Sequence, residues 1–248
     1  MSKEVTLTPV YIDIANSFAS MMGEEKVMSF TSEGSSIKGF GGSMSVEYRT
    51  PEGDKENIKE PIAVYNAPEF LKIVDFVDSK TMSMEYTDPV VTIQDDSKKF
   101  KYITCPLNLV PETNPDLAST FNAQEQSYAR IIIDESNLDD IVSSIGVIDI
   151  DKAYLVVKED LSIAIELFST KTENSIEIAL NGKGSKPDKM EVPSPEVFKS
   201  LYSGLYQCDI KELEINGMEF VIMQLINKSI DAETEGTLTY SVILENDV

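Results

Sequence analysis

Two helix-forming stretches of this chain recur at one fixed distance along the sequence. Ala67-Pro68-Glu69-Phe70-Leu71-Lys72 in the first half matches Ser194-Pro195-Glu196-Val197-Phe198-Lys199 in the second. The offset from Pro68 to Pro195 is called the repeat offset. It also places Ile14 on Ile141, inside a second helix-like stretch of each half. One shared period at two separate helices rarely arises by chance. The chain is therefore expected to contain one folding plan twice.

Each half reads as two helices and a set of strands. The spacing of apolar residues predicts helices that begin near Pro9, Pro68, Glu135 and Pro195. Asn216-Gly217 is a strong signal for a hairpin turn. Strand-like runs separated by turn residues cover 26–31, 43–48, 62–65, 81–86, 90–94, 100–105, 152–157, 162–168, 175–179, 211–215, 219–225 and 237–244.

The stretch from Pro111 to Ser127 has no periodicity and contains two prolines, as a linker does. We therefore expect a first domain over 1–115, an interdomain connector over 116–127 and a second domain over 128–248. The predicted fold class is α+β: two tandem repeats of one domain, each an antiparallel sheet with two helices on one face.

Two glycine-rich stretches lack the spacing of nucleotide-binding motifs. Gly39-Phe40-Gly41-Gly42 is followed by no helix, which favours a tight turn or a bulge. Asn181-Gly182-Lys183-Gly184-Ser185-Lys186 lacks the phosphate-loop pattern and is expected to be a mobile surface loop.

The composition excludes several kinds of chemistry. None of the 248 residues is a histidine, which removes Ser-His-Asp and Cys-His catalysis and histidine-ligated zinc. Two cysteines are too few for a Cys₄ metal site or a disulfide-stapled scaffold. The acidic pairs do not follow the spacing of a calcium loop. We therefore expect no enzymatic activity, no cofactor and no bound metal.

The charge balance is strongly acidic. The chain has 43 acidic and 21 basic side chains, a formal net charge of −22, which normally repels nucleic acid and anionic membranes. No apolar run approaches the ~18–20 residues of a membrane span, and the first residues lack the apolar core of a signal peptide. The cytoplasm is the expected location.

Among the few basic residues, Lys72 and Lys199 occupy equivalent positions on equivalent helices. Both lie off the apolar stripe of the helix, so we expect both to be exposed. A solvated lysine without a role is the alternative for either one, and the repetition favours function.

Three stretches carry a resemblance to a known family. They are Ala63 to Asn66 running into Phe70 to Val74, then Ile132 to Glu159, and finally Tyr240 to Asp247. Together with the duplication, they resemble the ring-shaped sliding clamps, the processivity factors of DNA polymerases, and among these the clamps of tailed bacteriophages.

The resemblance implies a homotrimer of two-domain subunits that forms a closed ring, with helices lining the hole and sheets forming the outer wall. Such a ring would encircle double-stranded DNA without sequence specificity, tether the replicative DNA polymerase and be loaded by an ATP-dependent clamp loader. If the protein is phage-encoded, it would act in the bacterial host cytoplasm. Edge strands would join the subunits.

A ring that holds DNA by topology needs no tight phosphate contacts. A negative net charge is therefore compatible with a ring around DNA. The resemblance and the repeat together indicate Lys72 and Lys199 as DNA-facing residues, with Lys80 and Arg130 as further candidates. The inner helices also carry Asp13, Asp75, Asp139 and Asp140, so the hole is expected to be only weakly positive.

The family also implies a groove for short partner peptides near the connector. The residues that could form its apolar walls are Leu107, Val110, Leu117, Tyr240 and Val242. The alternative is that all five are ordinary core or linker residues.

A different class of function stays open: a nonenzymatic, duplicated α+β adaptor that binds proteins and never encircles DNA. Oligomeric state separates the two, because the clamp requires a closed trimer. An enzyme is the third possibility and would depend on carboxylates alone.

Overall fold

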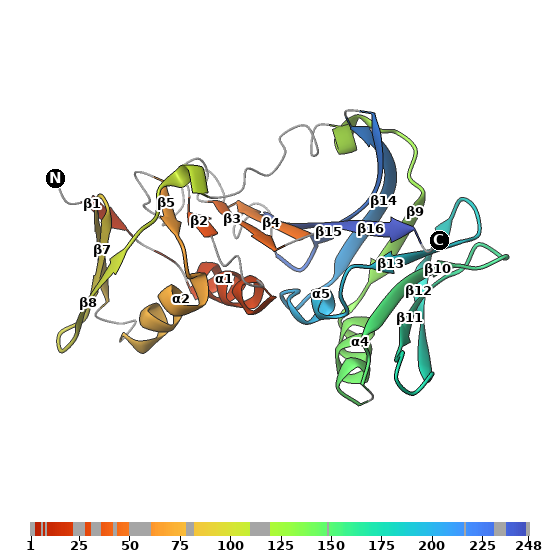
Figure 1. Ribbon diagram of the computed structural model, residues 1–248, viewed down its shortest axis with the longest axis horizontal. Helices are drawn as coiled ribbons and strands as arrows, with labels where there is room; N and C mark the ends of the chain where they lie inside the picture. The colour runs from red at the N-terminus through yellow and green to blue at the C-terminus, as the bar shows by residue number, and fades with distance from the viewer. Residues whose placement is uncertain are drawn as a thin grey trace. The chain divides into compact units, whose positions relative to one another are not determined.

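The structure is a computed structural model that describes residues 3–5, 7, 9–21, 28–30, 36–41, 44–49, 61–77, 82–109, 120–147, 149–215, 217–230 and 237–246 (Figure 1). The chain divides into two compact units. Unit 1 comprises Met1–Glu112 and Asp231–Leu238, and unit 2 comprises Thr113–Ile230 and Thr239–Val248.

Unit 1 contains two antiparallel four-stranded sheets and two helices. One sheet has the order β1-β6-β7-β8, and the other has the order β5-β2-β3-β4. The elements are β1 (Lys3–Val5), α1 (Pro9–Met21), β2 (Met28–Phe30), β3 (Ser36–Gly41), β4 (Met44–Arg49), β5 (Ile62–Val64), α2 (Ala67–Phe76), β6 (Ser83–Thr87), β7 (Val90–Gln94), β8 (Lys99–Ile103) and the 3₁₀ helix η1 (Leu107–Leu109).

Unit 2 contains one antiparallel sheet with the order β13-β10-β11-β12-β9-β14-β15-β16, whose two end strands also pair with each other. A helical turn at 120–123 precedes it. The elements are β9 (Ala129–Ile133), α4 (Glu135–Val147), β10 (Lys152–Val157), β11 (Ile163–Phe168), β12 (Ser175–Gly184), β13 (Asp188–Val192), α5 (Glu196–Lys199), β14 (Tyr206–Ile215), β15 (Met218–Asn227) and β16 (Thr237–Asn246).

The two units share their order of strands and helices, and six strand pairs of unit 1 have counterparts in unit 2, whereas the β9–β12 pair of unit 2 has none among the described residues of unit 1. In unit 1 the pairs are β1–β6, β6–β7, β7–β8, β2–β3, β3–β4 and β2–β5. Their counterparts in unit 2 are β9–β14, β14–β15, β15–β16, β10–β11, β11–β12 and β10–β13. The bridge Ala63–Cys105 of unit 1 corresponds to the β13–β16 pairing.

Side-chain caps fix where the helices begin. The Asn66 Oδ1 atom accepts from the Glu69 backbone N–H at 3.4 Å, and Asp134 Oδ1 accepts from the Asn137 N–H at 2.8 Å. The helix starts predicted near Pro68 and Glu135 are confirmed. Burial also follows the repeat, because the pairs Ile14 and Ile141, and Phe18 and Ile145, are buried at the repeat offset.

The predicted hairpin at 216–217 is confirmed, since β14 and β15 pair up to Ile215 and Met218. Gly217 has a φ of 76°, which suits glycine. The helix predicted from Pro195 is a single turn, α5. It ends early because the Tyr202 N–H donates to the Tyr240 hydroxyl at 3.2 Å instead of continuing the helix.

Residues 39–41 and 181–184 of the two glycine-rich stretches lie in strands, whereas Gly42 lies outside the described residues and residues 185–186 form a bend. The surface loop expected at 181–184 is therefore wrong. Ser36–Gly41 form β3 between β2 and β4. Residues 181–184 extend β12 and pair with β9. A Cβ atom at Gly182 would collide with the Arg130 carbonyl oxygen, and one at Gly184 with the Val157 side chain. Gly182 lets β12 and β9 approach closely, and Gly184 leaves room for the Val157 side chain of β10, so glycine does not mark a loop here.

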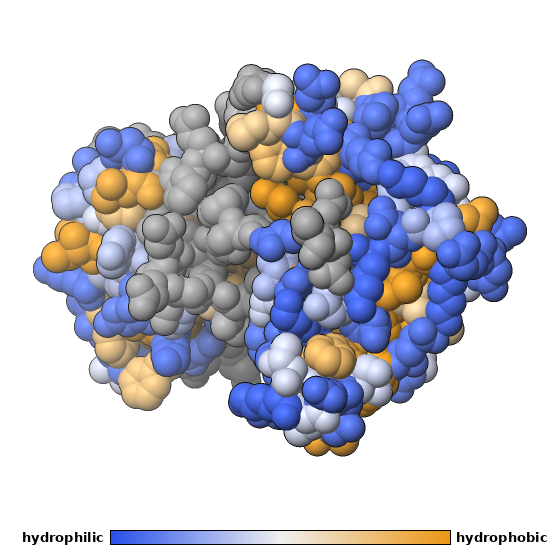
Figure 2. Space-filling view, turned by 45° about the vertical axis from the view of Figure 1, so that its right-hand side comes forward, coloured by the Kyte–Doolittle hydropathy of each residue, from blue (hydrophilic) through white to orange (hydrophobic). Residues whose placement is uncertain are grey.

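Hydrophilic residues predominate on the face seen in Figure 2, and hydrophobic ones gather in separate small areas. None of the helices in the described ranges is long and apolar enough to cross a bilayer.

Candidate functional site

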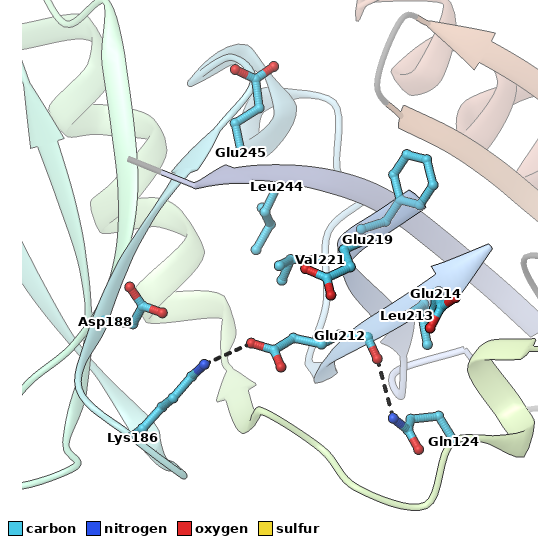
Figure 3. A pocket seen from close by; sticks show the side chains of 11 residues that line it. Gln124, Lys186, Asp188, Glu212, Leu213, Glu214, Glu219, Val221, Leu244 and Glu245 are labelled. Atoms are coloured by element: carbon cyan, nitrogen blue, oxygen red, sulfur yellow. Dashed lines mark hydrogen bonds and ion pairs between the residues drawn. The ribbon is translucent and has the colours of Figure 1, made fainter. Parts of the chain in front are cut away.

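A pocket of about 940 Å³ lies in unit 2 (Figure 3). It is formed by the β14–β15 hairpin, the segment that leads into β13, the end of β16 and the segment after the helical turn 120–123. The residues that line it are Gln124, Lys186, Asp188, Glu212, Leu213, Glu214, Glu219, Phe220, Val221, Leu244 and Glu245.

The floor of the pocket is apolar. Leu213, Val221 and Leu244 line it and are at most 8% exposed. Leu213 belongs to a cluster with Phe121, Ile215 and Ile222, against which the half-buried Phe220 packs. Phe121 comes from the helical turn 120–123, so part of the predicted connector packs into the core of unit 2.

The rim is acidic. Five carboxylates line the pocket, from Asp188, Glu212, Glu214, Glu219 and Glu245, and Lys186 is the one cation among the lining residues. In Figure 3 the Lys186 and Glu212 side chains point toward each other, and Lys186 Nζ lies 2.9 Å from Glu212 Oε1. This hydrogen bond to Glu212 raises the pKa of Lys186, so the ammonium is charged at neutral pH.

Lys186 has a second neighbour, the aromatic ring of Tyr128. Its ammonium lies 5.1 Å from the centroid of the Tyr128 ring. The Tyr128 hydroxyl donates to Asp188 Oδ2 at 2.7 Å, and burial, followed by this hydrogen bond, raises the pKa of Tyr128. A second cavity of about 280 Å³ is lined by Gln124, Lys186 and Glu212 as well, so the ion pair borders both cavities.

Unit 1 has a smaller pocket, of about 310 Å³, at the corresponding place in its fold. Its lining includes Tyr86 and Pro61, which the repeat offset places on Leu213 and Asp188. Its one carboxylate, Asp88, accepts a hydrogen bond from the Tyr86 hydroxyl at 3.1 Å. The two pockets therefore share a position in the fold but differ in charge.

The predicted DNA-facing residues occupy different settings. Lys72 is exposed on α2, and the described residues offer its ammonium no ion-pair partner. Lys199 is exposed on α5 and paired with Glu196 at 2.8 Å. Arg130 lies on strand β9 with its Nε atom 2.7 Å from Asp209 Oδ1, so it is not on a helix. Lys80 lies outside the described residues.

The exposed faces of the helices are acidic in each unit taken separately. In unit 1, Lys72 stands among the exposed residues Asp13, Glu69 and Asp75. In unit 2, the exposed charged residues of α4 and α5 are Lys199 and four carboxylates, from Glu135, Asp139, Asp140 and Glu196.

Of the five predicted groove residues, Leu107 lies in the described part of unit 1, and Tyr240 and Val242 lie in the described part of unit 2. Tyr240 and Val242 are fully buried in the core of unit 2. Leu107 is 48% exposed and lines the pocket of unit 1. Val110 and Leu117 lie outside the described residues. The pocket of unit 2 was missed because its carboxylates look like solvated side chains in sequence. The hairpin signal with alternating Glu212, Leu213, Glu214 and Ile215 was the available clue.

The arrangement suits binding better than catalysis. An apolar floor and a charged rim can hold a side chain and select the charge beside it. No group of three or more histidine, cysteine, aspartate or glutamate residues within the described ranges could hold a metal ion.

Comparison with known proteins gives a match in structure alone. No protein-family model matches this chain, and no curated protein does. The Helicobacter pylori beta clamp in complex with 5-chloroisatin has a TM-score of 0.65 at 12% identity, over 98% of this chain and 65% of that chain. The present chain thus spans about two thirds of the beta clamp subunit.

Clamps of another type match over their whole length. The A. fulgidus PCNA bound to the C-terminal region of FEN-1 has a TM-score of 0.62 at 14% identity, over 100% of this chain and 99% of that chain. Entamoeba histolytica PCNA has a TM-score of 0.62 at 14% identity, over 98% of both chains. The fold of this chain is that of the sliding clamps.

Proposed function

We propose that this chain is the subunit of a sliding clamp, a nonenzymatic DNA polymerase accessory protein that encircles duplex DNA and confers processivity. The observation that carries the proposal is the match to PCNA over the full length of both chains. An ATP-dependent clamp loader would place the ring on DNA. The three stretches of resemblance support the tailed-bacteriophage type.

The proposed subunit consists of two tandem clamp domains, over 1–115 and 128–248, joined by a connector over 116–127. The support is the shared order of strands and helices, and the six strand pairs that have counterparts in both units. The closed ring would be a homotrimer, in which six similar domains surround the DNA.

Two open strand edges support the assembly. In the described part of unit 1, β8 pairs on one side with β7 and has no ladder on its other side. In unit 2, residues 175–180 of β12 pair with β11, while β9 pairs only with residues 181–184. An open edge is a template for another strand. We propose that β8 of one copy pairs with β12 of the next.

Exposed apolar side chains in both units fit such a contact. Phe76 and Ile103 of unit 1 are 62% and 73% exposed, and Val147 of unit 2 is 77% exposed. Large exposed apolar residues near an open edge mark an interface. Lys99 and Lys101 are exposed on β8, and Glu177 is exposed on β12, so the charges are of opposite sign.

Within the ring, Lys72 and Lys199 would face the duplex from α2 and α5. Because carboxylates outnumber them on the helices of each unit, the ring would retain DNA by closure rather than by phosphate contacts. The pocket of unit 2 would receive short peptide segments of the polymerase and of the clamp loader.

The first test is the solution mass of the full chain by light scattering over a dilution series. A clamp is expected at about three times 27.5 kDa. The trimer is then assembled by a clamp loader on nicked circular DNA. It should stay bound in high salt and leave when the circle is cut, because sliding off an end releases a closed ring. A monomer, or loss from intact circles, would contradict the proposal.

The adaptor remains the second candidate, and the acidic helical faces favour it, since they suit a basic protein better than DNA. The same experiment separates the two functions. An adaptor would show no difference between circular and linear DNA.

A further inference from the structure

We propose that the pocket of unit 2 selects segments in which an apolar anchor is flanked by lysine or arginine, and that Lys186 is an internal competitor for the same carboxylates. The inference rests on the proposed docking role of this pocket and adds the chemistry of the occupant. The pocket combines an apolar floor with five carboxylates and one lysine on its lining.

The floor specifies the anchor. Leu213, Val221 and Leu244 are almost fully buried at the base of the pocket. The pocket has a volume of about 940 Å³, which admits a large aliphatic or aromatic side chain. Phe220 is half-buried at the same wall, so an incoming ring would gain contacts that water does not provide.

The rim specifies the charge. Glu212, Glu214 and Glu219 come from one hairpin, and Asp188 and Glu245 lie on the neighbouring strands β13 and β16. Like charges this close repel one another, and a bound cation relieves that repulsion. An acidic segment would add to the repulsion among the carboxylates. The pocket therefore discriminates by charge as well as by shape.

Lys186 already makes part of this contact within the chain. Its ammonium and the Glu212 carboxylate are 55% and 56% exposed as side chains, and exposed ion pairs contribute little to stability. An incoming cation can therefore replace Lys186 at Glu212 with small loss. The Tyr128 ring, 5.1 Å from the Lys186 ammonium, offers the displaced charge a second partner.

Displacement would also enlarge the site. The Lys186–Glu212 pair borders both the main cavity and the one of about 280 Å³ lined by Ser127, Tyr128 and Ser185. When the Lys186–Glu212 ion pair separates, the two cavities become one that extends toward the connector. The corresponding pocket of unit 1 has one carboxylate, Asp88, already hydrogen-bonded by Tyr86, so it lacks this charge selection.

The test uses two fluorescein-labelled synthetic peptides that share a Leu-Leu-Phe anchor, one flanked by lysines and one by glutamates. Fluorescence anisotropy with the full-length protein should show tighter binding of the lysine peptide. The difference should shrink as sodium chloride is raised, because salt screens exposed charges. Equal affinity, or no binding of either peptide, overturns the inference.

Variants connect the effect to the pocket. Glu212→Gln with Glu219→Gln should weaken the lysine peptide by about three- to tenfold. The matched control, Glu159→Gln with Glu173→Gln, makes the same charge change at exposed positions outside the pocket and should leave the affinity unchanged. Equal weakening by both pairs would mean that only the net charge matters, and would overturn the inference.

Lys186→Met tests the competitor. It should tighten the lysine peptide about two- to fivefold, since the carboxylates lose their internal partner. In the Glu212→Gln background the same change should have a smaller effect, because the competition is already removed. Weaker binding in Lys186→Met would contradict the role of Lys186. Light scattering and retention on circular DNA do not depend on these peptides, so failure of the charge selection is distinguishable from failure of the clamp.

Discussion

Tyr240 shows how one buried hydroxyl can join two elements of unit 2. It accepts the Tyr202 backbone N–H at 3.2 Å and lies 3.5 Å from the Ser200 carbonyl oxygen, while its ring contacts Tyr206 edge-on at 6.1 Å between centroids. The hydroxyl therefore ties β16 to the segment after α5. Sequence patterning places an aromatic residue in a strand but cannot reveal a partner so distant in the chain.

Tyr240→Phe should destabilise the protein by about 1–2 kcal/mol, because it leaves the Tyr202 N–H without its acceptor. Urea unfolding followed by circular dichroism measures the change. Tyr65→Phe is the control, since Tyr65 is 64% exposed. Equal midpoints for the two variants would show that the hydroxyl does not carry this role.

The two cysteines should differ in reactivity. Cys208 is fully buried on β14, and burial raises the pKa of its thiol. Cys105 is half-buried, and burial raises its pKa as well. A thiol-specific disulfide reagent should label one cysteine per native chain and two in denaturant. Labelling of Cys105 should accelerate as pH rises, with its midpoint above that of a free cysteine. Equal labelling of both thiols in the native protein would contradict this.

At the scale of elements, local chemistry predicted the helices and most of the strands. The caps Asn66 and Asp134 and the Asn216-Gly217 turn act over a few residues and can be recognised in sequence. The strands β1, β3, β9 and β13 and the second half of β12 were not predicted, because the pairing of each is decided by neighbours distant in the sequence. The rim of the unit 2 pocket was missed for the same reason, since only strand pairing brings Asp188, Glu212 and Glu245 together.

Two glycines in regular elements should respond in opposite directions to the same substitution. Gly146→Ala, in α4 with nothing within 4 Å of the added Cβ, should stabilise the protein by about 0.5–1 kcal/mol. Gly182→Ala should destabilise it by about 1–3 kcal/mol, because the Cβ meets the backbone of β9. Thermal unfolding compares the two. A shift of both in the same direction would refute the close approach of β12 and β9.

At the scale of the whole molecule, formation of the proposed ring depends on few side chains. Ile103→Glu should convert the trimer to monomers, because it buries a charge at the proposed β8–β12 contact. Each chain should remain folded, since Ile103 is 73% exposed. Light scattering and circular dichroism measure both. Met218→Glu, at a position 58% exposed on the β14–β15 hairpin of unit 2, is the control, and a persistent Ile103→Glu trimer would exclude this contact.

The helical lysines should matter for loading more than for retention. Lys72→Glu with Lys199→Glu should lower loader-dependent primer extension, because the helices lose their exposed cations. Lys183→Glu with Lys228→Glu makes the same charge change outside the helices and should have little effect. Unchanged extension in the first pair would exclude a role in facing DNA.

In the described residues, the strand contact of unit 1 that corresponds to the β13–β16 pairing is shorter than that pairing. Two residue pairs join β13 to β16, whereas the described residues of unit 1 show one bridge, Ala63–Cys105, with a hydrogen bond of 3.0 Å from the Cys105 N–H to the Ala63 carbonyl. A seam with fewer backbone hydrogen bonds opens more often. Amide deuterium uptake should therefore be faster at the Cys105 N–H than at the β13–β16 pairing, and equal rates at the two places would contradict this.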